Sequence, residues 1–185
     1  QVHDSISLSG RAKAALAANE QVLGDASSAV QDFAKNAVQS VGLSERAALQ
    51  AGTAFGQLGK VAGLAGDDLS EFSIDMITLA ADLAAFADVP ADQAVQDLRA
   101  AFAGSTETMQ KYNIFLNETE LKAALFRATG EEVTGVLTSQ QRVLATHAAL
   151  LEQTGDIQGQ AAREADSFQR AQDNLKASME NMAAS

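Results

Sequence analysis

The sequence contains no cysteine, no tryptophan, one proline and only nine aromatic residues among its 185 residues. Without cysteine the chain cannot form disulfides, thiolate metal sites or cysteine nucleophiles, which suits assembly in a reducing cytoplasm. So few large side chains cannot fill a dense globular interior. The sequence instead contains 38 alanines, which favour helices that approach closely through small residues. We therefore predict an all-α fold, either a helical bundle or a coiled-coil assembly.

Long hydrophobic runs are also missing from the sequence. No window reaches the roughly 18 consecutive apolar residues of a membrane-spanning helix, and the N-terminus lacks the basic-then-apolar pattern of a signal peptide. We therefore expect a soluble chain. Because it begins with Gln1 instead of Met, we also expect it to be a segment of something longer or a processed product.

Basic residues are scarce where acidic residues are dense. The chain has 13 Lys and Arg against 24 Asp and Glu, a net charge of −11. Such an acidic balance repels nucleic acid, and the basic residues form no stripe with aromatic ones, so we expect no sequence-specific nucleic-acid binding. We interpret the main acidic block as a solvated helix face that keeps an alanine-rich protein soluble. That block covers residues 61–98, which have no Lys or Arg and eight acids: Asp67, Asp68, Glu71, Asp75, Asp82, Asp88, Asp92 and Asp97.

Three segments are predicted along the chain. Residues 1–42 form an alanine-rich segment, helical over 5–40 with an interruption near Gly24, whose apolar positions are too sparse for an independent core. It is expected to need a partner. Residues 43–158 form a compact module of short helices joined by Gly, Pro and Asn turns. Residues 159–185 form a C-terminal coiled-coil-like helix with a thin apolar seam that includes Phe168, Leu175 and Met182.

Four glycines lie on one predicted helix, which begins after Gly42 and Ser44 and runs from residue 45 to about 63 or 66. In a helix interior each glycine costs about 1 kcal/mol relative to alanine, and close approach of another helix would offset that cost. We favour packing within one subunit over contact with another chain. The glycines are four, three and four residues apart, so they share one narrow face: Gly52, Gly56, Gly59 and Gly63.

The next helix, predicted over residues 68–87, has the most regular pattern in the sequence. Apolar residues recur every three or four positions, beside an edge of acids. Pro90, preceded by Val89, ends this helix and opens another that reaches residue 103. The apolar stripe comprises Leu69, Phe72, Met76, Leu79, Ala80, Leu83 and Phe86, and the acidic edge comprises Asp68, Glu71, Asp75 and Asp82.

The segment from Gly104 to Leu116 contains two helix ends and one helix start. Gly104 suits the left-handed position after a helix, and Ser105 or Thr106 offers a capping oxygen, with Glu107 in the first turn. A helix of about two turns should end at Tyr112. Asn113 tolerates a left-handed conformation, and Ile114 can pack back onto the turn.

Two further helices have predicted capping pairs at their starts. Asn117 with Glu120 opens a helix that ends at Gly130, and Thr138 with Gln141 opens a helix that ends at residue 154. Residues 155–159 contain two glycines that interrupt the helical pattern before the C-terminal helix.

No catalytic, cofactor or metal site is predicted, and we expect no enzyme. The Gly59-Lys60 pair fails the spacing of a phosphate-binding loop and is followed by Val61 instead of Ser or Thr. His147 lies on the apolar face of its helix without a His or Glu at i+4, so we interpret it as a core or interface residue. The adjacent acids Asp67 and Asp68 point about 100° apart on a helix, which favours a capping role over a metal site.

From residue 43 to about residue 175, the sequence resembles the conserved helical region of tail tape-measure proteins from long-tailed bacteriophages and prophages. Each motif consists mostly of helix-capping and packing residues, and it is their order and spacing along the chain that carry the resemblance. Asn113 departs from the family, which often has Gly there, but conserves the backbone role. The matching residues are Phe55 and its neighbouring glycines, Asp82-Leu83 with Phe86, Gly104 to Glu107, Tyr112-Asn113-Ile114, residues 137–141, Gln158-Gly159, Ser167, Gln172 and Leu175.

This resemblance implies a structural component of the virion tail. Such a protein lies in the lumen of the tail tube, sets tail length, nucleates tube polymerisation in the bacterial cytoplasm and leaves during genome ejection. We also predict a homo-oligomer, based on the thin seam from Phe168 to Met182 and on the glycine face. Implied partners are the tail tube protein, tail assembly chaperones and tail-tip or baseplate proteins, with membrane contact confined to ejection. The acidic block could then help DNA to slide past. The alternative is a membrane-active or channel-forming helical module for genome delivery, based on the glycine face from Gly52 to Gly66 and on the alanine-rich amphipathic helices.

Overall fold

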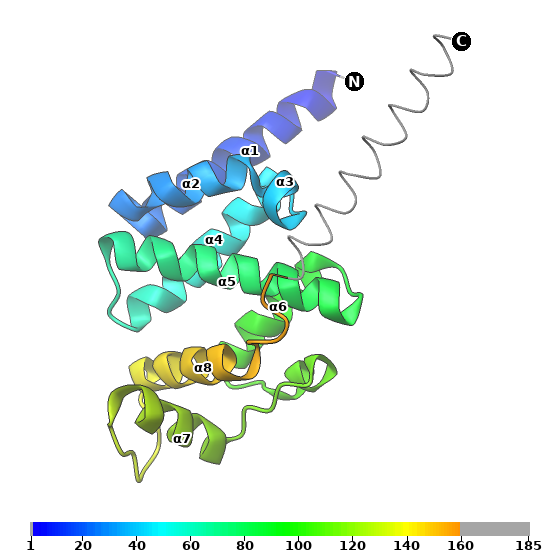
Figure 1. Cartoon of the computed structure of the whole chain (residues 1–185). Coiled ribbons are helices and arrows are strands. Elements are labelled where there is room, and N and C mark those ends of the chain that lie inside the picture. Colours follow the sequence, from blue (N-terminus) through cyan, green and yellow to red (C-terminus); the bar gives the residue numbers. More distant parts are fainter. Residues whose placement is uncertain (1, 160–185) are drawn as a thin grey trace, which may run out of the picture.

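The computed structural model describes residues 2–159, with side chains from residue 10 onward. Helices account for all regular structure in this range, which confirms the all-α prediction. The elements, drawn in Figure 1, are α1 (Val2–Leu23), the 3₁₀-helix η1 (Gly24–Ala26), α2 (Ser27–Lys35), α3 (Ala37–Val41), α4 (Glu45–Val61), α5 (Gly66–Ala87), α6 (Ala91–Phe102), the 3₁₀-helix η2 (Glu107–Tyr112), α7 (Glu118–Thr129) and α8 (Ser139–Gln153).

Local capping chemistry sets several helix starts where the sequence predicts them. The Ser44 hydroxyl accepts a hydrogen bond from the backbone N–H of Ala47, and the Asn117 side chain accepts one from Glu120. Thr138 and Gln141 form a reciprocal capping box, in which each side chain accepts from the other's backbone N–H. These bonds satisfy N–H groups that a helix start leaves unpaired.

The helices form two groups joined by α6. Figure 1 shows α1, α2 and α3 against the α4–α5 pair, while α7 and α8 pack on each other beyond α6. α8 also packs on α4 and α6, so the two groups share one hydrophobic core. Buried Leu23, Val30 and Val41 belong to that core together with Phe55 and Leu150.

The helices on the two sides of the predicted boundary at residue 42 are in contact, because α1 and α2 pack on α4 and α5. The predicted C-terminal segment, 159–185, with Phe168, Leu175 and Met182, lies outside the described residues except for Gly159.

Candidate functional site

The corner between α6 and α7 is built by the residues that carry the family resemblance. Gly104 and Asn113 both adopt left-handed backbone conformations, with φ of 107° and 61°, as predicted. The intervening helix is a 3₁₀-helix. A capping oxygen was predicted from Ser105 or Thr106, but the residue at the N-cap position, Thr106, makes no side-chain capping hydrogen bond. The backbone N–H of Ile114 donates to the Met109 carbonyl at 3.2 Å, and the Ile114 side chain is fully buried.

A buried carboxylate fixes this corner to α6. The Tyr112 hydroxyl donates to Asp97 Oδ2 at 2.6 Å, Lys111 Nζ lies 3.0 Å from the same oxygen, and Gln93 Nε2 donates to Asp97 Oδ1 at 3.0 Å. Burial alone would raise the pKa of the Asp97 carboxyl, but the three donors outweigh it and hold the pKa below its usual value. Burial and the bond to Asp97 raise the pKa of Tyr112.

This arrangement serves as an anchor. The carboxylate accepts from three donors, so both of its oxygens are engaged inside the protein, and Asp97 is only 3% exposed. A charged group in that state stabilises the fold that supplies its donors. Among the described residues no group of three or more His, Cys, Asp or Glu side chains could hold a metal ion.

The prediction that the acids of 61–98 form a solvated face is wrong for Asp82 and Asp97, which are 1% and 3% exposed. Asp82 Oδ2 accepts a hydrogen bond from the backbone N–H of Gly159 at 2.8 Å, which ties the turn after α8 to α5. Asp97 lies on the same side of α6 as the buried residues Ala94 and Ala101, and this position was the available signal for its burial.

Other family-motif residues lie at the surface. Phe86 is 49% exposed near the end of α5, so its predicted place on the apolar stripe is wrong. Glu107 is exposed in the first turn of η2. Neither contributes to the anchor at Asp97.

Three glycines of α4 face other helices of the same chain. A Cβ built on Gly52 would lie 2.6 Å from Cγ1 of Val30 in α2, and one on Gly56 would lie 2.5 Å from Cδ2 of Leu23 in α1. A Cβ on Gly59 would lie 2.7 Å from Cδ1 of Leu69 in α5. These distances are shorter than van der Waals contact, so a side chain at any of the three positions would displace the side chain that faces it.

Gly63 does not belong to this face. α4 ends at Val61, and Gly63 lies in the following turn with φ of 91°. Its predicted place on a shared helix face is therefore wrong. Gln140 of α8 closes this turn by donating to the Ala62 carbonyl at 3.0 Å.

His147 lies between α8 and α5, where its ring meets Phe72 edge to face at a centroid distance of 5.1 Å. Its buried Nε2 makes no hydrogen bond within the part of the chain that the structure describes. Burial lowers the pKa of His147, as expected for a neutral histidine in a packed interior.

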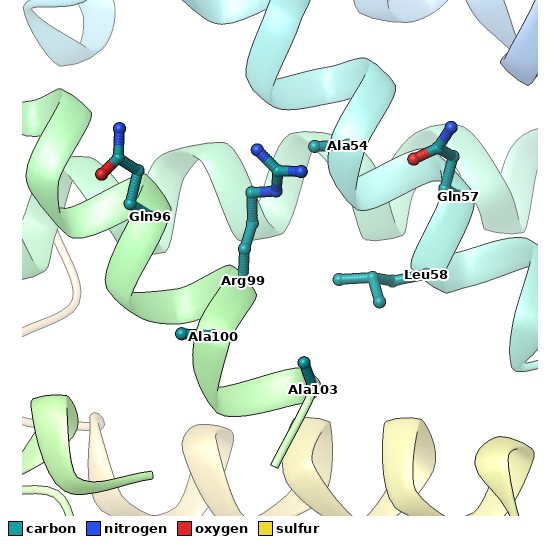
Figure 2. A pocket seen from close by; sticks show the side chains of 7 residues that line it. All are labelled: Ala54, Gln57, Leu58, Gln96, Arg99, Ala100 and Ala103. Atoms are coloured by element: carbon teal, nitrogen blue, oxygen red, sulfur yellow. The ribbon is translucent and has the colours of Figure 1, made fainter. Parts of the chain in front are cut away.

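A shallow groove separates α4 from α6 on the outer side of the molecule. Figure 2 shows Arg99 extending between the two helices, above a floor of small apolar side chains. Gln57 and Gln96 flank the groove on opposite sides. The remaining lining residues are Ala54, Leu58, Ala100 and Ala103.

Among the described helices, none is both long and apolar enough to cross a bilayer. Comparisons of the chain with protein-family models, with curated proteins and with solved structures find no match.

Proposed function

We propose that this chain is a structural segment of a phage tail tape-measure protein, located in the lumen of the tail tube. The observation that carries the proposal is the corner from Gly104 to Ile114. Gly104 and Asn113 supply its left-handed turns, and Tyr112 anchors it to Asp97. The residues of the resemblance thus have a joint packing role, which favours a structural function.

The geometry points to a compact module within the ruler. A continuous helix advances about 1.5 Å per residue, so 158 residues in one helix would extend about 240 Å. The longest helices among residues 2–159 have 22 residues, or about 33 Å, and they fold back on one core. In this proposal the module is a cap, an anchor or a chaperone-binding region, and longer helices elsewhere in the protein set tail length.

Electron microscopy of assembled tails tests this division of roles. One variant of the full protein lacks a helical stretch outside residues 43–158, and it should give tails shortened in proportion to the deletion. A second variant carries Gly56→Leu inside the module, and it should give fewer tails of normal length. Unchanged length in the first variant would refute the ruler role, and uniformly shortened tails in the second would refute the module role.

The membrane-active alternative rested on the glycine face of α4. Gly52, Gly56 and Gly59 pack against Val30, Leu23 and Leu69 of the same chain, so this face is covered. We therefore favour the structural function. Insertion of the folded full chain into liposomes would reverse that preference.

A further inference from the structure

The outer side of α4 is polar and carries basic residues. It is distinct from the face whose glycines contact α1, α2 and α5. Its residues recur at helical spacing, three or four apart, and are exposed or half-buried: Arg46, Gln50, Thr53, Gln57 and Lys60.

Basic residues from neighbouring helices extend this surface on both sides. A groove between α1 and α4 is lined by Arg11 and Arg46 above the small side chains of Ala14 and Ala18. The groove between α4 and α6 contains Arg99 (Figure 2). We refer to Arg11, Arg46, Lys60 and Arg99 with these two grooves as the basic face.

An acidic face lies on the other side of the α4–α5 pair. Asp68, Glu71 and Asp75 are exposed on α5 at spacings of three and four residues. The α5 residues that meet the glycines of α4 are Leu69, Phe72, Ser73 and Ile77, so the three acids occupy the side of α5 that faces away from α4.

The charges of both faces are unpaired within the described part of the chain. The ion pairs there involve Asp32 with Lys35, Asp97 with Lys111, and three contacts of the α7–α8 pair. None of them uses a residue of the basic face or of the acidic face. Each face thus presents charges that the opposite face could neutralise in another molecule.

We propose that the basic face docks the acidic face of α5 from a second copy of this chain. The small apolar side chains that line both grooves admit close approach of a helix, and the arginines of the grooves meet its carboxylates. Because the two faces differ, the association is heterologous (head to tail), which builds a ring or an open stack. The charges of the two faces carry this proposal, and it stands whether or not the phage function is correct.

Sedimentation velocity of the full chain tests the association. At about 20 mM salt we expect species larger than the monomer that increase with protein concentration, and at about 0.5 M salt we expect the monomer, because salt screens exposed charges. A wild-type chain that stays monomeric at low salt and high concentration overturns the proposal.

Charge reversal identifies the two faces. The variant Arg46→Glu/Arg99→Glu removes the net positive charge of the basic face, because Arg11 and Lys60 then balance the two new glutamates. The variant Asp68→Lys/Glu71→Lys/Asp75→Lys makes both faces basic. Each variant, measured alone, should self-associate at least about tenfold more weakly than the wild type, since the exposed ion pairs across the interface are lost. An equimolar mixture should associate again, because each variant then meets a partner of opposite charge.

A matched control separates the face from overall charge. Lys35→Glu/Lys122→Glu changes net charge as much as the first variant does, and it should associate like the wild type. Circular dichroism checks that each variant keeps its helical fold, and Arg46→Gln/Arg99→Gln replaces the first variant if the reversed charges unfold it.

Undiminished self-association of a charge-reversed variant refutes the proposal, as does an equimolar mixture of folded variants that stays monomeric. If the wild type instead binds a polyanion such as heparin without self-association, the basic face has a different partner and the proposal fails.

Discussion

The helices α1–α5 and the helices α6–α8 are held together by different means. In α1–α5, glycines let backbones approach until side chains of Val30, Leu23 and Leu69 occupy the space of a missing Cβ. Within the described residues of this group, Asn19 alone joins two helices through side-chain hydrogen bonds, to the Leu49 carbonyl and to Thr53.

In α6–α8 the connections are polar and directional. Asp97 holds Tyr112 across the corner, and the Gln153 amide donates to the Phe115 carbonyl and accepts from its N–H, both at 2.9 Å. Arg127 donates from two nitrogens to Glu152 at 3.0 and 2.7 Å, which joins α7 to α8. The same alanine-rich chain therefore fixes one group of helices by shape and the other by specific hydrogen bonds.

This difference has consequences for stability. Shape complementarity depends on volume and is insensitive to pH, so it fails when a side chain is added. A hydrogen-bonded anchor depends on the charge of its members and fails when a partner is removed or protonated. Substitutions in the two groups should therefore respond differently to added volume and to acid.

The largest effect is expected for Gly56→Leu. Even a Cβ at this position would lie 2.5 Å from Leu23 Cδ2, and a leucine must push α1 away from α4. We expect a loss of about 3 kcal/mol or more, partly offset by the better helix propensity of leucine. Urea unfolding monitored by circular dichroism measures the change.

Gly10→Leu provides the matched control, because a Cβ on Gly10 of α1 would meet no atom within 4 Å. It should stabilise the helix by about 0.5 to 1 kcal/mol through propensity alone. Equal destabilisation by the two substitutions would show that shape does not hold α1–α5 together.

A smaller effect is expected at the anchor. Asp97→Ala removes the acceptor of Tyr112, Lys111 and Gln93 and should cost about 2 kcal/mol, whereas Tyr112→Phe removes one donor and should cost about 1 kcal/mol. In both variants the amides of the corner should exchange hydrogen faster than in the wild type, while the amides of α1–α5 stay protected. Uniform loss of protection would contradict a local anchor.

Acid should abolish the difference in folding stability between the wild type and the variant Asp97→Asn. The folded-state pKa of Asp97 lies below its ordinary value of 3.8, so its charged form stabilises the fold above that pH. This contribution is lost as the pH falls through the folded-state pKa. The free-energy difference between the wild type and Asp97→Asn should therefore be constant near neutral pH and shrink in strong acid, and a difference that persists there would exclude the charge as its source.

The sequence predicts the local features of this fold well and the long-range ones poorly. The caps at Ser44, Asn117 and Thr138 and the left-handed turns at Gly104 and Asn113 follow from residues within four positions of one another. Such features need no knowledge of neighbouring helices.

Whether a helix residue is buried depends on which other elements cover that side of the helix. This explains why the burial of Asp82, Asp97 and Phe86 was predicted wrongly. Asp82 is covered because residue 159, far along the chain, returns to α5, while Phe86 at the end of the same helix stays exposed. The partner of Asp97 lies 15 residues away, beyond a turn. Similarly, α1 and α2 join the core through contacts with glycines, which leave little hydrophobic periodicity to read.

The smallest effect on stability is expected at Asn113, where the backbone conformation contributes in addition to the hydrogen bond between Tyr112 and Asp97. Its φ of 61° suits glycine better than any other residue, and asparagine tolerates it. Asn113→Gly should change stability by less than about 0.5 kcal/mol, whereas Asn113→Ala should cost about 1 kcal/mol because its Cβ strains the left-handed turn. If both variants unfold at the wild-type urea concentration, the turn relaxes without cost and Tyr112 is positioned by Asp97 alone. If only the alanine variant unfolds at a lower urea concentration, the backbone turn at Asn113 and the buried carboxylate of Asp97 together position Tyr112. The corner then requires both residues.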